Sequence, residues 1–324
     1  MASLKFNNIY LNDYLTITGP LESNSKLRKI EFKMEDYYYG EKTFEQAEAK
    51  MQKIVIEEII KKNGLKYNDI DILIGGDLLD QISATGYASK DIPISLLGIY
   101  SACATFPETL IVGSFALNDK NIKKVLGVTS SHNLSAERQF RYPIEYGSPK
   151  PHTSTFTTTA GISTLLSKTE SDIKIESATI GKVIDMGISD ANNLGAVMAP
   201  AAADTLFEHL KDLKRDIDYY DLILTGDLGC IGSNIFKEYC KINYNIKLKK
   251  YLDAGCELYL KSQDTYSGGS GPACLPLVLF NKILPSKKYK KILIIGTGAL
   301  HSKTFVNQKN SIPAIAHAVS LEVL

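Results

Sequence analysis

The sequence predicts an α/β protein that is built from two similar halves related by a pseudo-two-fold axis. Two observations support this prediction. Short apolar runs that end in glycine, which are typical of buried parallel strands, alternate with amphipathic helical patterns along the 324 residues. The same series of blocks also occurs twice, once in residues 1–170 and once in residues 171–324. We expect each half to form a mixed sheet covered by helices, so that two sheets pack about the axis.

The first half begins with a predicted helix over residues 43–63, followed by Gly64 as a candidate C-cap. Residues 71–78 (DILIGGDL) then have the pattern of a buried strand. Residues 123–132 predict a further strand, and residues 155–167 close the half. The apolar face of the helix consists of Ala47, Met51, Val55, Ile59 and Ile60.

The second half repeats these blocks in the same order. Residues 199–213 predict a helix, and residues 221–228 (DLILTGDL) predict the strand that follows it. Residues 290–301 match the Lys-Lys strand at 123–132, and residues 312–324 close the half. Coincidence among generic α/β elements is the alternative, but four matching blocks in one order favour duplication. Because ligands gather at the carboxyl ends of strands in open α/β sheets, we expect a site between the halves.

The composition excludes several classes of function. The 37 Lys and Arg residues nearly cancel the 36 Asp and Glu residues, so there is no global field for nucleic acid or for an anionic membrane. No apolar run is long enough to span a membrane, and the N-terminus lacks the pattern of a signal peptide. Any membrane association would therefore be peripheral or through a partner.

The cysteines indicate a reducing compartment. Their number is odd, their spacing is wide and no C-x-x-C pattern occurs, which argues against a disulfide framework and against a structural zinc site. We expect neither a metal nor a cofactor. The five cysteines are Cys103, Cys230, Cys240, Cys256 and Cys274.

Cys103 is the first candidate for a site. Thr105 and Glu108 have the spacing of a capping box, and Pro107 suits a first helical turn, so Cys103 falls at or just before a helix N-terminus. Backbone N–H groups there lower the pKa of a thiol and hold anions. The alternative is a small buried apolar residue, which is the commonest fate of a cysteine outside disulfides.

Polar residues that follow the strand at 123–128 form the second candidate. Ser130, Ser131 and His132 are expected to face the ligand crevice, and Glu137 follows them. Two of the four arginines, Arg138 and Arg141, lie three residues apart and can share one helical face. Arginine binds carboxylates in a bidentate manner that lysine cannot reproduce. A surface ion pair is the alternative role for these arginines.

Two further stretches are weaker candidates. Residues 267–274 (SGGSGPAC) form a glycine-rich loop before an apolar run, where backbone N–H groups around Ser270 could hold an anion. Close packing between the halves is the alternative. His301 follows a Gly-Thr-Gly turn and either faces the crevice or caps the loop. Asp77, Asp227 and Glu137 could ligate calcium, but their spacing fits no calcium loop. The remaining histidines, which lack metal-ligand spacing, are His152, His209 and His317.

The sequence resembles the stage V sporulation protein AD family of spore-forming Firmicutes, a branch of the thiolase superfamily. The resemblance spans essentially the whole chain. The matching stretches are Gly76-Asp-Leu-Leu, Tyr100-Ser-Ala-Cys, Thr129-Ser-Ser-His, residues 135–147 (SAERQFRYPIEYG), residues 224–229 (LTGDLG) and residues 264–272 (DTYSGGSGP). The resemblance implies a thiolase-like fold of duplicated halves in an α/β/α/β/α arrangement.

The resemblance also implies a function in binding. Members of the family are regarded as non-catalytic proteins that bind dipicolinic acid (pyridine-2,6-dicarboxylate), or its calcium chelate. They act with SpoVA membrane proteins in the uptake of this compound into the developing spore. A peripheral location on the cytoplasmic face of the forespore inner membrane would follow, and two chains could pair as a homodimer. Ligand contacts are then expected from Cys103, Ser130, Ser131, His132, Glu137, Arg138 and Arg141, and less strongly from Asp77, Ser270 and His301.

Departures from the thiolase pattern argue against catalysis. Thiolases use a nucleophilic cysteine, a histidine in a Gly-His-Pro loop and a second cysteine before a glycine-rich turn. Cys103 matches the first position, but the loop before Pro272 has no histidine, and the turn at 295–298 (IGTG) has no cysteine. A thiolate without a base loses most of its catalytic advantage. An acyltransferase that uses Cys103, with His132 or His301 as the base, is the alternative.

Overall fold

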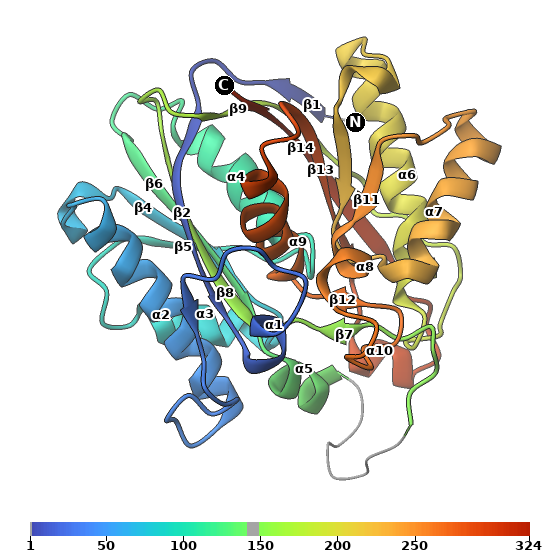
Figure 1. Ribbon diagram of the computed structural model, residues 1–324, viewed down its shortest axis with the longest axis horizontal. Coiled ribbons are helices and arrows are strands. Elements are labelled where there is room, and N and C mark those ends of the chain that lie inside the picture. Colours follow the sequence, from blue (N-terminus) through green and yellow to red (C-terminus); the bar gives the residue numbers. More distant parts are fainter. Residues whose placement is uncertain (1, 141–148) are drawn as a thin grey trace.

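The computed structural model describes residues 2–140 and 149–324 of the chain. Within these residues, twelve strands form one mixed sheet, whose main path runs β11-β10-β13-β14-β9-β2-β8-β6-β4-β5 (Figure 1). The strands on this path are β2 (Tyr10–Thr18), β4 (Ile72–Gly76), β5 (Leu96–Gly98), β6 (Lys124–Ser131), β8 (Ala160–Ser167), β9 (Ile173–Ile180), β10 (Leu222–Thr225), β11 (Tyr251–Asp253), β13 (Lys291–Ala299) and β14 (Ala314–Val323). Two short strands pair with its centre, β1 (Ala2–Lys5) with β9 and β3 (Phe32–Lys33) with β2.

The strand order confirms the predicted duplication. From the centre outward, the first half runs β2-β8-β6-β4-β5 and the second runs β9-β14-β13-β10-β11. In chain order both halves therefore place their first strand innermost, followed by the fifth, fourth, second and third. The pairing directions repeat as well, because the two inner pairs of each half are antiparallel and the two outer pairs are parallel. The division at residue 170 stays a prediction.

The prediction of two separate sheets is wrong. The innermost strands of the two halves, β2 and β9, pair antiparallel through Tyr10–Lys174 and Leu11–Ile173. This short ladder joins the half-sheets into one continuous sheet. Within the first half, β3 covers this edge of β2 only at Ile17 and Thr18, so the part at Tyr10 and Leu11 is left to pair with β9.

Three hydrophobic clusters show five layers, as the thiolase-like arrangement requires. Helix α2 (Phe44–Lys62) packs on the outer face of the first half-sheet, and α6 (Leu194–Leu213) with α7 (Gly229–Tyr244) covers the second. Between the half-sheets lie α4 (Thr105–Ala116) and α9 (Cys274–Val278), and the central cluster joins their side chains to strands of both halves (Figure 1). The halves therefore share one core.

The two principal predicted helices are present. All five residues of the predicted apolar face of α2 are buried, and Gly64 follows the helix with a φ of +64°. That left-handed conformation suits glycine, which has no Cβ. Helix α6 begins at Leu194, five residues before the predicted start, and buries Pro200 in its interior. In the described residues, no helix is long and apolar enough to cross a membrane.

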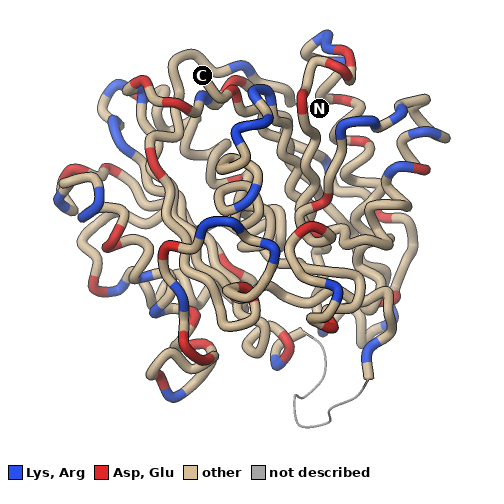
Figure 2. Tube along the Cα trace, viewed as in Figure 1, with Lys and Arg blue, Asp and Glu red and all other residues tan. Residues whose placement is uncertain are grey.

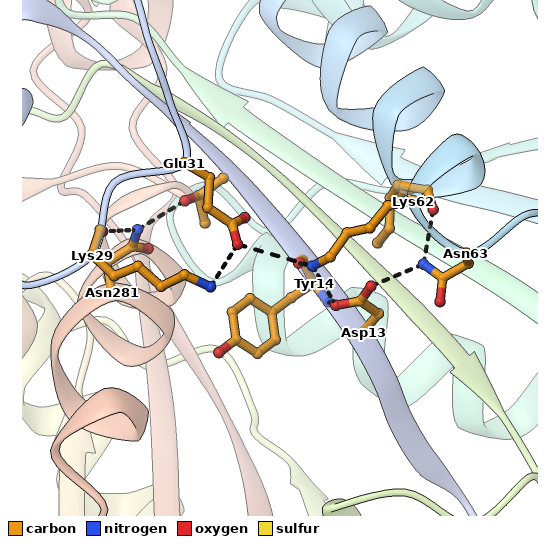
Figure 3. A network of polar contacts seen from close by, with 9 residues as sticks. Asp13, Tyr14, Lys29, Glu31, Lys62, Asn63 and Asn281 are labelled. Atoms are coloured by element: carbon orange, nitrogen blue, oxygen red, sulfur yellow. Dashed lines mark hydrogen bonds and ion pairs between the residues drawn. The ribbon is translucent and has the colours of Figure 1, made fainter.

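Acidic and basic residues are interspersed along the chain in both halves of the fold (Figure 2), and their numbers nearly cancel. One polar network connects the halves across the sheet junction (Figure 3). Within the first half, the Lys62 ammonium and the Asn63 amide both donate to the Asp13 carboxylate, at 2.8 and 2.9 Å. From the second half, the Asn281 amide donates to the Thr16 hydroxyl at 2.9 Å. Beside them, the Tyr14 ring stacks on Phe280 of the second half with 4.2 Å between centroids. Polar and aromatic contacts thus reinforce the short β2–β9 ladder.

The argument against a disulfide framework fails for one pair of cysteines. Cys230 and Cys256 form a disulfide between the starts of α7 and α8 (Ala254–Leu258), with 4.7 Å between their Cα atoms. Sequence spacing could not reveal this pair, because Cys230 and Cys256 are 26 positions apart and only the tertiary fold brings the starts of α7 and α8 together. Cys240 and Cys274 are buried thiols.

Candidate functional site

Cys103 lies in a tight turn immediately before α4, as predicted. Ala102 has a φ of +50°, and the turn is held by the Thr105 hydroxyl, which accepts from the Ser101 N–H at 3.1 Å and donates to the Ala102 carbonyl at 2.7 Å. The predicted capping box is wrong, because Ala104 is the N-cap residue and its side chain cannot accept a hydrogen bond. Thr105 instead lies in the first helical turn, where its hydroxyl stabilises the turn that carries Cys103.

Strand β13 supports this turn from the other half of the molecule. A Cβ atom on Gly298 would lie 2.2 Å from the Ser101 carbonyl oxygen, and one on Gly296 would lie 2.4 Å from the Pro107 ring. The two glycines of the Gly-Thr-Gly sequence therefore let β13 approach the start of α4. Their role here is close packing between the halves, which places Cys103 at the interface.

Cys103 opens into a small inner cavity of about 50 Å³. The cavity lies between the halves, at the carboxyl ends of β4, β5 and β13, where the sequence predicts the ligand crevice. Its apolar wall includes Leu78, Met198 and Leu194. Its polar lining residues are Tyr100, Cys103, Thr155, Thr157, Ser270 and His301. Three predicted site residues, Cys103, Ser270 and His301, therefore share one cavity.

A larger outer cavity of about 700 Å³ adjoins the inner one. The two share Leu78, Tyr100, Phe140 and His301 in their walls. The outer cavity adds a lysine, a carboxylate and several amide and hydroxyl groups, from Lys303, Asp80, Gln81, Gln139, Asn307, Ser302 and Thr304. Its volume falls within the range of about 300–1,000 Å³ that is usual for small-molecule sites.

The walls of the outer cavity are held by specific hydrogen bonds. Gln139 of α5 (Asn133–Phe140) donates to the Leu78 carbonyl at 3.0 Å and accepts from the Asp80 N–H at 2.9 Å. This links α5 to the loop after β4. Burial raises the pKa of Tyr100 to about 12, so its phenol is neutral at physiological pH and can donate a hydrogen bond.

The prediction that Ser130, Ser131 and His132 face the crevice is wrong. Strand β6 continues to Ser131, so these side chains lie inside the first half. The Ser130 hydroxyl donates to the Glu48 carboxylate at 2.8 Å, and the Ser131 hydroxyl donates to the Thr158 carbonyl at 2.7 Å. None of the three residues lines either cavity.

His132 is a neutral structural residue. Its Nδ1 accepts from the Leu134 N–H at 3.2 Å, which leaves Nε2 to donate to the Tyr37 carbonyl at 2.8 Å. Burial holds its pKa down at about 4. His132 therefore cannot serve as the base for Cys103, whereas His301 lines the same cavity as that thiol.

The predicted charged residues lie apart from the cavities. Arg138 forms an ion pair with Glu45 at 3.1 Å and lies over the Phe44 ring, which is the surface role considered as its alternative. Glu137 pairs with Lys150 at 2.6 Å. Arg141 lies outside the described residues, so its predicted role stays a prediction.

The three calcium candidates do not come together. Asp77 is buried in the first half, where it accepts from the Leu79 and Thr85 N–H groups at 2.8 Å. Asp227 is buried in the second half beside Asp253, and desolvation raises its pKa well above the usual range. Among the described residues, no group of three His, Cys, Asp or Glu side chains has an arrangement that could hold a metal ion.

Comparison with known proteins identifies the family. The family model for stage V sporulation protein AD (SpoVAD) matches residues 2–322. The chain is 42% identical over 318 residues to stage V sporulation protein AD of Bacillus subtilis (strain 168), covering 97% of this chain and 94% of that protein. The chain belongs to the SpoVAD family.

Solved structures of condensing enzymes share the fold of this SpoVAD family member. The match to OleA of Xanthomonas campestris covers 99% of this chain and 100% of OleA, with a TM-score of 0.63 and 12% identity. The match to 3-oxoacyl-(acyl carrier protein) synthase III of Xanthomonas oryzae covers 97% of this chain and 99% of that enzyme, with a TM-score of 0.60 and 14% identity. At this identity the likeness establishes the thiolase-like fold alone.

Sequence reasoning missed several lining residues of this SpoVAD family member. Tyr100 and Phe140 fall inside stretches that match the family, so a search for aromatic residues there could have found them. Gln139 is adjacent to Arg138, but Gln139 lines the outer cavity, whereas Arg138 pairs with Glu45. Lys303 had no signal, because the lysine-rich sequence gives a single lysine no distinction.

Proposed function

We propose that this SpoVAD family member is a non-catalytic binding protein for dipicolinic acid, free or as its calcium chelate. In this proposal it acts with SpoVA membrane proteins in dipicolinate uptake into the developing spore. It would do so as a peripheral protein on the cytoplasmic face of the forespore inner membrane. Family membership supports the proposal at the level of sporulation, and the chemistry of the outer cavity supports the choice of ligand.

The single observation that carries the ligand assignment is the composition of the outer cavity. Tyr100 and Phe140 offer aromatic surface to a flat ring, and Lys303 offers a positive charge to a carboxylate. Amide groups of Gln81, Gln139 and Asn307 add hydrogen-bond donors. The ligand therefore belongs in the outer cavity, because the inner cavity is smaller and its described lining residues include no lysine or arginine.

The calcium chelate fits the same location. Asp80 places a carboxylate in the wall of the outer cavity, and calcium prefers oxygen ligands. In this arrangement the dipicolinate supplies most of the ligands and the protein adds to them.

A thermal-shift panel tests the proposal. The ligands are dipicolinate, dipicolinate with calcium, pyridine-3,5-dicarboxylate and acetoacetyl-CoA. A ligand at 100 times its Kd adds about 2.7 kcal/mol to the free energy of unfolding. We expect dipicolinate to stabilise the protein and the 3,5-isomer, whose carboxylates diverge, to have little effect. Stabilisation by both isomers alike, or by neither, would contradict the proposal.

An acyltransferase is the second candidate, and one observation favours it. Cys103 and His301 line the same inner cavity, in a fold shared with condensing enzymes. A thiol beside an imidazole is an arrangement that activates cysteine nucleophiles. In the same panel, a covalent acyl adduct that forms with acetoacetyl-CoA and is absent from Cys103→Ala, detected by mass spectrometry, would favour this candidate over the binding function.

A further inference from the structure

The disulfide between Cys230 and Cys256 lies where a reductant can reach it. Cys230 is exposed and Cys256 is half-buried, whereas Cys240 and Cys274 are buried. The two bonded residues belong to the first turns of α7 and α8. The disulfide therefore ties together the starts of two helices at the surface of the second half.

A buried carboxylate holds the same two helix starts. One oxygen of Asp253 accepts from the Gly229 and Cys256 N–H groups, both at 3.0 Å. Its other oxygen accepts from the Leu228 N–H at 3.1 Å and from the Thr225 hydroxyl at 2.7 Å. Hydrogen bonds to Asp253 and the disulfide therefore both hold the starts of α7 and α8 together.

The starts of α7 and α8 both contact the glycine-rich loop. On the α7 side, the Cys230 N–H donates to the Ser267 carbonyl at 2.6 Å. On the α8 side, a Cβ atom on Gly255 would lie 2.2 Å from the Gly269 carbonyl oxygen, and one on Gly268 would lie 2.4 Å from the Gly255 carbonyl oxygen. The loop backbone is therefore packed directly against the helix starts that the disulfide joins.

The glycine-rich loop forms part of the wall of the inner cavity. Its strand β12 (Gly269–Ser270) pairs with β7 (Phe156–Thr157). Ser270 and Thr157, from the two strands of this pair, line the cavity that contains Cys103. A continuous set of contacts therefore connects the exposed disulfide with the candidate site.

We propose that the Cys230–Cys256 disulfide is a redox site at which a dithiol reductant loosens this wall of the cavity. A thiolate of the reductant attacks the sulfur of Cys230, the more exposed of the two residues, the Cys230–Cys256 bond breaks, and Cys256 leaves as a thiolate that takes up a proton. The second thiol of the reductant then attacks the mixed disulfide. The reductant is released as a disulfide, and Cys230 becomes a thiol, so the protein gains two electrons and two protons.

The consequence is local, because Asp253 and the core remain in place after reduction. Without the covalent link, the starts of α7 and α8 can move apart. The backbone of residues 265–271, which packs against both starts, is then held less firmly. Of the two cavities, Ser270 and Thr157 line the inner one, so the loosened wall would act on a compound that enters beside Cys103. The change in loop order does not rest on the proposed function, which assigns dipicolinate to the outer cavity.

Hydrogen exchange measured by mass spectrometry tests the inference without a ligand. The oxidised wild type, the wild type treated with dithiothreitol and the Cys230→Ser/Cys256→Ser double variant are compared. We expect amide exchange in residues 265–271 to accelerate by roughly an order of magnitude in the last two samples, with α2 unchanged. Dithiothreitol should have no effect on the double variant. The control variant Cys240→Ala should respond to the reductant as the wild type does.

Two results would overturn the inference. One is equal exchange of residues 265–271 in the oxidised and reduced wild type. The other is full alkylation of Cys230 and Cys256 in protein kept under oxidising conditions, which would show that no disulfide forms. Failure of dipicolinate to bind would not affect either measurement, so the inference and the proposed function fail separately.

Discussion

At the scale of single residues, buried titratable groups decide how stability depends on pH. Burial, helped by the nearby Asp77 carboxyl, raises the pKa of Glu48 to about 8 in the folded protein, against about 4.3 when unfolded. The folded state thus binds the extra proton, and this stabilisation is full below pH 4 and is lost as the pH rises through 8. His132 acts in the opposite direction. Its pKa is about 4 in the folded protein and about 6.5 when unfolded, so the unfolded state binds a proton first and the protein loses stability as the pH falls below about 6.5.

These signs predict a loss of stability on the alkaline side of neutrality. Between pH 6.5 and 8.5 the His132 contribution changes by only about 0.4 kcal/mol, whereas ionisation of Glu48 should lower the free energy of unfolding by about 1–2 kcal/mol. Denaturant titrations at both pH values should show a smaller loss for Glu48→Gln. The matched control Glu45→Gln, on the same helix but at the surface, should behave as the wild type. Equal losses in all three proteins would contradict the assigned role of Glu48.

Residue types alone located only part of the site. The spacing before α4 correctly placed Cys103 beside a helix start, and His301 and Ser270 do line the inner cavity. Ser130 and His132 were expected beside them because they follow an apolar run. The run continues as a strand through Ser131, and its core-facing side chains are bonded to Glu48 and to backbone carbonyls. Which way a side chain points depends on the register of the sheet, which the local sequence does not specify.

At the scale of elements, close backbone contacts matter more than caps. The start of α4 lacks the predicted capping box, yet it is fixed by Thr105 and by the approach of β13 through Gly296 and Gly298. Helices α2 and α6 were predictable because their apolar periodicity is long and regular. The glycines of β13 were interpreted as a turn, because glycine signals a turn and a close approach equally well.

Substitution of Gly298 tests the packing of these elements. In Gly298→Ala the new Cβ would lie 2.2 Å from a carbonyl oxygen of the Cys103 turn, so the strand or the turn must move. We expect a loss of about 1–3 kcal/mol in thermal or denaturant unfolding, together with altered reactivity of Cys103 toward a thiol reagent. Gly86→Ala is the matched control, since nothing lies within 4 Å of its added Cβ. Unchanged stability of Gly298→Ala would contradict the close packing.

At the scale of the whole molecule, repetition made the fold predictable. Matching blocks in residues 71–78 and 221–228 correctly indicated two halves of the same topology, and the strand orders agree. The joining of the half-sheets could not be predicted, because it depends on two residue pairs between β2 and β9. The disulfide between α7 and α8 was hidden for a similar reason, since tertiary contacts bring its cysteines together.

The balance of charges over the molecule limits how it could attract a charged ligand. Opposite charges are mixed over both halves, so no broad field attracts an anion (Figure 2). On the proposed function, recognition of a small dianion would then depend on a local cation in a cavity, and Lys303 is the lysine that lines the outer cavity among the described residues. Arg138, which the sequence favoured for this role, is engaged with Glu45 instead.

Calorimetric titration of dipicolinate into the wild type, Lys303→Ala and Arg138→Ala is the most direct test of the cavity assignment. The wild type and Arg138→Ala should bind with similar affinity. Lys303→Ala should bind about tenfold more weakly, which corresponds to about 1.4 kcal/mol. Equal affinity of wild type and Lys303→Ala, with weakened binding only in Arg138→Ala, would place the ligand elsewhere and contradict the account.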